Sequence, residues 1–225
     1  MKLLKAFNIM IILLGSIIQV SAQGSNLRQI FDYIILNMEP VASSELKEKG
    51  LPKDFYSAKK AFDGKIETTW VEGVDGDGIN EYIMFDLLFR GPYPTYDEFK
   101  DKDVKVEITI VNGVAKNKKI WEMNNRIKKA ELEVYEAPIT IRQIDPWIIS
   151  EQEPILNTTF TLNLKDDIKP QKFLLKIRPK KLGITENKNS FFTCIGKLII
   201  KEVYPGTKYK DTGISEIDIN RIDDN

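Results

Sequence analysis

One stretch of the sequence, Ala61–Tyr82, concentrates residue types that could hold a metal ion or a ligand. It reads AFDGKIETTWVEGVDGDGINEY. Calcium prefers six to eight oxygen ligands, many of them backbone carbonyls, with few side-chain carboxylates. Asp63 can offer a carboxylate, and Thr68 can offer a hydroxyl and its carbonyl, so a calcium loop is one interpretation. The other is a plain β-turn at Asp63-Gly64, where glycine can take a positive φ.

The acidic run Asp75–Gly78 begins like an EF-hand loop but does not continue as one. An EF-hand needs Asp or Asn at its fifth position and glycine at its sixth. Counted from Asp75, those positions hold Ile79 and Asn80. We therefore expect a glycine-rich turn that leads into a strand at Tyr82.

Two tryptophans and one polar segment could form a ligand site. Trp70 and Trp121 could be stacking platforms for a sugar ring, or they could belong to the core, as is usual in small β-domains. The segment Val111–Lys129 contains amides and a guanidinium, which are good donors to hydroxyls and carboxylates. Its polar candidates are Asn112, Lys116, Asn124 and Arg126. A solvated loop with an Asn-Gly turn is the alternative.

Catalytic chemistry has little support in the sequence. The chain contains no histidine, which excludes Ser-His-Asp and Cys-His catalysis and most zinc sites. Asp166 and Asp167 are neighbours, and adjacent strand residues point to opposite faces, so they make a poor acid/base pair. A carbohydrate-acting hydrolase needs two carboxylates about 5 to 10 Å apart across a cleft. The one dense carboxylate cluster outside the tails is formed by Glu72, Asp75, Asp77 and Glu81.

The N-terminal residues 1–22 have the features of a secretory signal peptide. Two lysines precede a largely apolar run, Phe7–Ile18, and small residues at Val20 and Ala22 indicate a cleavage site. A spanning helix needs roughly 18 or more apolar residues, and this run is shorter. We therefore expect a secreted or periplasmic protein whose mature chain has no transmembrane anchor.

The net charge and the cysteine content bear on the kinds of partner and on disulfide bonds. The formal net charge is zero, and cleavage after Ala22 would remove two lysines and no acid, which leaves −2. A near-neutral protein has no global attraction to nucleic acid or anionic lipid, so we expect no nucleic-acid partner. Cys194 is the only cysteine, which excludes an internal disulfide, and its apolar neighbours predict a buried thiol.

Seven segments that alternate apolar and polar residues predict strands. They are 82–88, 104–110, 129–136, 159–164, 172–178, 197–203 and 214–220. Strict alternation is typical of antiparallel sheets with one buried face, and this many short strands indicate an all-β sandwich or jelly roll. Helical spacing over Leu27–Asn37 predicts a short helix before them, ended by Met38-Glu39-Pro40.

Several motifs, found in one order along the chain, resemble a bacterial discoidin-like family. They are SAKKAFDGKIETTWVEG, GDGINEY, VNGVAKN with WEMNNRIKKAELEV, and YPGTKYKDTGISEIDI. The family is described as the glycan-binding or translocation domain found beside a NAD glycohydrolase toxin, and it is related to the coagulation factor V/VIII type C domains. The resemblance implies a galactose-binding-like jelly-roll β-sandwich over residues 41–219. It leaves an N-terminal segment, 23–40, and a frayed tail, 220–225.

The resemblance also implies a structural cation. In discoidin-like domains the cation lies where the DG…T loop meets a glutamate near the C-terminus, which implies Asp63, Thr68 and Glu216 as calcium ligands here. Two positions depart from the family pattern. Asn80 replaces the second glycine of GIGE, and Val114 stands where an aromatic residue commonly follows Asn-Gly. The toxin's catalytic domain has no counterpart in this sequence.

Together these features indicate a secreted, non-enzymatic carbohydrate-binding module that recognises a surface or envelope glycan. The expected ligand contacts are Trp70, Glu72, Asn112, Lys116, Trp121, Asn124 and Arg126. One alternative is a protein-interaction or adhesin subunit of the cell envelope, which would need an exposed apolar patch. A hydrolase is the least favoured alternative.

Overall fold

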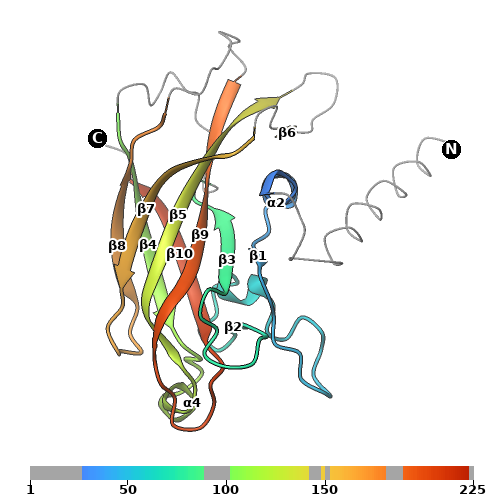
Figure 1. Ribbon diagram of the computed structural model, residues 1–225, viewed down its shortest axis with the longest axis vertical. Helices are drawn as coiled ribbons and strands as arrows, with labels where there is room; N and C mark the ends of the chain where they lie inside the picture. The colour runs from blue at the N-terminus through green and yellow to red at the C-terminus, as the bar shows by residue number, and fades with distance from the viewer. Residues whose placement is uncertain (1–26, 89–101, 142–147, 150–152, 181–189, 223–225) are drawn as a thin grey trace, which may run out of the picture.

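The protein is an antiparallel β-sandwich with one helix packed against its outside (Figure 1). The computed structural model describes residues 27–88, 102–141, 148–149, 153–180 and 190–222. The expected signal peptide at 1–22 lies outside these residues. All seven segments that alternate in the sequence are strands or parts of strands, which confirms the all-β fold class.

The larger sheet has six strands, in the order β1-β3-β9-β5-β6, and β7 also pairs with β5. The strands are β1 (Val41–Ala42), β3 (Tyr82–Asp86), β5 (Arg126–Ile141), β6 (Ile148–Ile149), β7 (Ile155–Asn163) and β9 (Ser190–Tyr204). β5 and β9 pair along almost their whole lengths and form the centre of this sheet. The expected strands at 129–136 and 197–203 are inner parts of these two long strands.

The smaller sheet has four strands, in the order β2-β10-β4-β8. They are β2 (Trp70–Val71), β4 (Val104–Asn112), β8 (Gln171–Ile177) and β10 (Gly213–Ile222). β10 was expected to end near Ile219, with a frayed tail after it. It continues to Ile222 instead, because Asn220, Arg221 and Ile222 pair with β4 in regular antiparallel register.

The main core fills the space between the two sheets. On β4, Val104, Val106, Ile108 and Ile110 are buried, and the residues between them face outward. Cys194 on β9 belongs to the same core and is fully buried. Burial raises the pKa of its thiol well above the usual range, so the thiol is inert, as the sequence predicted.

Helix α2 (Leu27–Asn37) covers part of the outer face of the larger sheet. Its buried side chains lie on one stripe and pack against Met84 and Ile195, forming a second apolar cluster. The helix ends at Met38, which has a positive φ of 55° and donates its N–H to Ile34 O at 2.8 Å. Among the described residues, no helix is long and apolar enough to cross a membrane.

Helix α4 (Lys118–Met123) lies inside the segment that the sequence presented as a polar loop. Asn117 caps its first turn, because its side-chain oxygen accepts the N–H of Ile120 at 3.0 Å. The helix is only six residues long and buries a single large side chain, Trp121. Such a short helix has no apolar stripe, so periodicity could not reveal it.

Replacing Phe31 by alanine tests how much the α2 cluster contributes to stability. The ring is fully buried, so Phe31→Ala should lower the free energy of unfolding by about 3 to 5 kcal/mol, through lost burial and a new cavity. Urea denaturation measures the change. Leu174→Ala, at an exposed side chain on β8, is the matched control and should change stability by less than about 0.5 kcal/mol. Equal losses in the two variants would contradict a stabilising role for α2.

Candidate functional site

The loops at one end of the sandwich bring together most of the residues expected to bind a ligand. In Figure 1, α4 and the turn between β9 and β10 lie side by side at the lower end. Three backbone hydrogen bonds join them: Thr207 N–H to Glu122 O, and the N–H groups of Lys208 and Tyr209 to Met123 O. These loops therefore form one connected unit.

Arg126, at the start of β5, is at the centre of this unit. Its guanidinium forms a two-bond pair with Asp166, with Nε 3.0 Å from Oδ1 and Nη2 2.8 Å from Oδ2. Nη1 donates to Asn124 O and to Pro205 O, at 3.1 and 2.8 Å. The residue is only 7% exposed. Its donors already serve protein groups, so a ligand could use them only by breaking these bonds.

Trp121 packs beneath that guanidinium. Arg126 Cζ lies 4.7 Å from the Trp121 ring centroid, and Trp121 Nε1 donates to Asn112 O at 2.8 Å. Gly113 has a φ of +75°, and a Cβ there would lie 2.7 Å from Arg126 Cγ and 3.0 Å from Trp121 Nε1. Only glycine therefore allows the two side chains to stack this closely.

Two asparagine side chains in this unit form hydrogen bonds with backbone groups of neighbouring residues. Asn112 is fully buried, and its amide group accepts the N–H of Ile127 and donates to the carbonyl of the same residue, at 2.9 and 2.7 Å. Asn124 is half-buried and donates to Ile120 O at 2.8 Å. Lys116 is exposed. Of the expected contacts from this segment, Lys116 alone is freely accessible.

Trp70 and Glu72 were also expected at a ligand mouth, and the structure places both inside the protein. Trp70 is fully buried in the main core, and its Nε1 donates to Ser44 O at 3.0 Å. Glu72 is fully buried and accepts the N–H groups of Val74 and Thr212, at 2.8 and 3.1 Å. Neither side chain has surface to offer a ligand. The core interpretation of Trp70 is the correct one.

Asn125 connects two neighbouring loops and was not among the expected ligand contacts. Its Nδ2 donates to Asp77 Oδ1 at 3.1 Å and to Lys210 O at 2.7 Å, and its Oδ1 accepts the N–H of Gly206 at 2.7 Å. Asn80, which replaces the second glycine of the family pattern, has a φ of +72°. Asparagine tolerates this left-handed conformation better than most residues. Asn80 can therefore take the same turn conformation as the glycine that it replaces.

An exposed aromatic cluster lies on the loops beside this unit. Phe55 and Tyr209 are 43% and 40% exposed. Phe55 and Tyr56 pack edge to face, with ring centroids 4.8 Å apart. Burial raises the pKa of Tyr56, and the charge of Glu48, its hydrogen bond with the Tyr56 hydroxyl and the charge of Asp211 raise it further. The Tyr56 carbonyl accepts the N–H of Val71, and Val71 pairs with Gly213, so Tyr56 and Tyr209 lie on adjoining loops although 153 positions separate them in the sequence.

The sequence contained a usable signal for this aromatic cluster. Phe55, Tyr56 and Tyr209 stand in polar, turn-rich segments that show no strand alternation. Large aromatic side chains in such segments have no strand or helix face on which to be buried, so they are candidates for binding. Trp70 and Trp121 were weighed instead, and both are buried. Trp147 lies outside the described residues.

The three expected metal ligands do come together. Thr68 Oγ1 lies 2.7 Å from Asp63 Oδ1 and 2.8 Å from Lys65 O. The pKa of Glu216 is raised to about 7, first by burial and then by the Asp63 carboxylate, while the N–H groups of Gly64 and Lys65 partly offset both effects. Glu216 Oε2 is buried without a hydrogen-bond partner. An orphaned carboxylate oxygen beside a second carboxylate, a hydroxyl and carbonyls fits the oxygen ligands that calcium prefers.

Within the described part of the chain, no three acidic or cysteine side chains gather as a metal cluster. A cation at Asp63 and Glu216 would therefore complete its coordination with backbone carbonyls and water. That composition suits calcium and does not suit zinc or iron.

Replacing Arg126 by methionine tests whether its hydrogen bonds to the surrounding loops stabilise the fold. Arg126→Met removes a buried cation from four polar partners, so it should lower the free energy of unfolding by about 2 to 4 kcal/mol. Thermal or urea unfolding measures the loss. Lys116→Met, at an exposed cation in the same segment, is the control and should unfold like the natural protein. If both variants keep the stability of the natural protein, the contacts of Arg126 do not stabilise the fold.

Comparison with known proteins places the chain in one family. Residues 36–220 match the family described as the NAD glycohydrolase translocation F5/8 type C domain. No curated protein matches the chain. The F5/8 type C domain of a Bacteroides fragilis protein is similar in structure, with 17% identity over 80% of this chain and 89% of that one and a TM-score of 0.39.

Two further structures are similar at low scores. The CBM32 domain of AlyQ, in complex with 4,5-unsaturated mannuronic acid, has 12% identity over 80% of this chain and 92% of that one, with a TM-score of 0.34. Arabinofuranosyltransferase AftD from Mycobacteria has 17% identity and a TM-score of 0.44, and the match covers 82% of this chain but only 10% of that one. The family match, which extends over most of the described sandwich, shows that the chain belongs to the NAD glycohydrolase translocation F5/8 type C domain family.

Proposed function

We propose that this F5/8 type C domain is an exported, non-enzymatic module that binds a surface or envelope glycan through the loop cluster of residues 43–57, 72–81 and 205–212. The observation that carries the proposal is the set of aromatic residues on these loops: Phe55 and Tyr209 are exposed, and Phe55 packs edge to face on the half-buried Tyr56. The residues around Trp121 and Arg126, where the sequence analysis expected the ligand, instead hydrogen-bond to the segment 205–209 and hold it in place.

The aromatic cluster has the chemistry of a sugar platform. The apolar face of a sugar ring packs on an aromatic side chain, and nearby polar groups fix its hydroxyls. Lys208 Nζ lies 4.7 Å from the Tyr209 ring centroid, so this loop also offers an ammonium group beside the ring.

The loops that carry the aromatic cluster are fixed before any ligand arrives. The N–H of Val71 donates to Tyr56 O at 3.3 Å, and Thr212 Oγ1 donates to Asp77 O at 2.8 Å. Asn125 ties Asp77 to the segment that contains Tyr209. Preorganised loops lose little conformational entropy on binding, which favours affinity.

Three of the four clustered carboxylates that a hydrolase could use are engaged in holding loops. Glu72 accepts two backbone N–H groups, Asp77 accepts from Asn125, and Glu81 accepts from the hydroxyls of Ser43 and Ser44. These contacts support a binding role. Export through the N-terminal segment would place the domain at an envelope or outside the cell, where such glycans are found.

We propose in addition that a calcium ion is bound by Asp63, Thr68 and Glu216. The orphaned Oε2 of Glu216 supports this proposal. The ion would neutralise two neighbouring carboxylates and join the loop after η1 (Ala58–Ala61) to β10. It would thereby tie together two segments that are far apart in the sequence.

Substitution at the aromatic cluster tests the glycan proposal. On a glycan array, the natural protein should bind a small set of glycans, and Tyr209→Ala should weaken that binding about tenfold, because losing an aromatic face costs roughly 1.4 kcal/mol. Leu174→Ala, far away on the edge strand β8, should bind normally. A blank array from folded natural protein would contradict the proposal and favour a protein partner in the envelope.

Calcium addition tests the metal proposal. Raising calcium to about tenfold above the dissociation constant should raise the Tm by about 4 °C, because binding stabilises the folded state by about 1.4 kcal/mol. Chelator should reverse the shift. Glu216→Gln should abolish it, whereas Asp218→Asn, two positions along the same face of β10, should retain it. A calcium shift that survives Glu216→Gln would place the ion elsewhere.

A further inference from the structure

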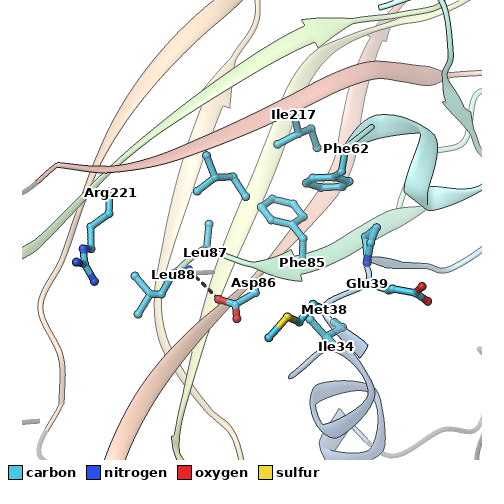
Figure 2. Close-up of a pocket in the computed structure, with 12 residues that line it drawn as sticks. Ile34, Met38, Glu39, Phe62, Phe85, Asp86, Leu87, Leu88, Ile217 and Arg221 are labelled. Carbon is cyan, nitrogen blue, oxygen red and sulfur yellow. Dashed lines mark hydrogen bonds between the residues drawn. The ribbon is translucent and has the colours of Figure 1, made fainter. Parts of the chain in front are cut away.

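A small cavity opens where the end of α2, the end of β3 and the second half of β10 meet. Figure 2 shows it between the two sheets, with Met38 and Glu39 on one side and Arg221 on the other. Its volume is about 180 Å³. None of its lining residues belongs to the loops 43–57, 72–81 and 205–212, so it is separate from the proposed glycan site.

The walls of this cavity are mainly hydrocarbon. Its apolar lining comes from Phe62, Phe85, Leu87, Leu88, Ile217 and Ile219. These side chains come from both sheets and from the segment after η1, and they are continuous with the main core. A void of this kind loses dispersion contacts along its whole lining, so an apolar occupant would recover them.

The charged groups that border the cavity already have protein partners. Asp86 Oδ1 accepts the N–H of Leu88 at 2.7 Å and lies 3.2 Å from Thr193 Oγ1. Glu39 accepts from Lys59 at 2.6 Å and from Tyr33 at 2.9 Å. Arg221 also interacts with other protein groups. A charged ligand would have to compete with these contacts, so the cavity favours a neutral occupant.

The rim of the cavity contains one exposed and adaptable side chain. Met38 directly follows helix α2, and its positive φ of 55° and its N–H bond to Ile34 O are those of a left-handed helix end. Its side chain is 53% exposed. The flexible thioether of methionine fits itself to apolar ligands.

We propose that this cavity binds one small uncharged hydrocarbon group, either an aromatic ring or a branched or short alkyl end. A 150 Å³ cavity lined only by Leu, Ile and Phe in another protein holds benzene. This cavity has a similar volume and the same apolar residue types, with Glu39, Asp86 and Arg221 at its border, so its apolar part accommodates about six carbon atoms. The group is either a free small molecule or the end of a larger amphiphile. Met38 lies at the mouth and covers the bound group. The proposal does not depend on glycan binding.

Toluene and 1-hexanol are suitable probes, with ligand-observed saturation-transfer NMR and thermal unfolding as readouts. Saturating toluene should show strong transfer from the natural protein and raise its Tm by about 2 °C. Ile219→Phe fills the cavity from β10 and should reduce the transfer at least fivefold with no rise in Tm. Leu174→Phe adds the same ring on the exposed face of β8 and should behave like the natural protein.

A second variant that fills the cavity keeps the test decisive if Ile219→Phe does not fold. Leu88→Phe enters the cavity from the end of β3 and should also lose toluene binding. Binding of both probes would support the end of an amphiphile as the natural occupant, and binding of toluene alone would support a free ring compound. Absence of transfer from the natural protein, or equal transfer from natural and filled proteins, would overturn the proposal.

Discussion

The buried guanidinium of Arg126 is the constraint on which the loop end of the sandwich depends. A buried cation is tolerated only when its donors are satisfied, and this one is satisfied by groups from separate segments. Asp166 lies between β7 and β8, Pro205 follows β9, and Asn124 follows α4. Each segment must return to the same point for the charge to be compensated. The contacts of Arg126 therefore fix the positions of the segments from which the exposed loops extend.

The sheet architecture could be predicted because it depends on a local pattern. Alternation of apolar and polar residues with period two follows directly from strand geometry, and each alternating segment is a strand. The ends of the strands could not be predicted in this way. Residues 220–222 look like a polar tail, yet they pair with β4. Arg221 occupies an inward-facing position there and borders a cavity, so residue type alone was misleading.

The binding residues were harder to predict because burial is a tertiary property. The structure brings together Asn112, Trp121 and Arg126, three of the residues that the sequence analysis expected to contact a ligand, because they belong to one short segment between two strands. The sequence could not show that their polar atoms would satisfy one another. The aromatic cluster had the opposite difficulty. The loops of Tyr56 and Tyr209 lie beside each other because Val71 on β2 pairs with Gly213 on β10 and donates to Tyr56 O, and that pairing cannot be read from either segment alone.

The pairing of β10 has a consequence for how the chain acquires its structure. β10 is the last strand in the sequence, yet it lies between β2 and β4, which are among the first. β3 likewise depends on β9. Contacts between residues so distant in sequence form slowly, because a long loop must close before they contribute any stability. A growing chain therefore cannot close either sheet around its early strands, and the sandwich assembles only when its C-terminal strand becomes available.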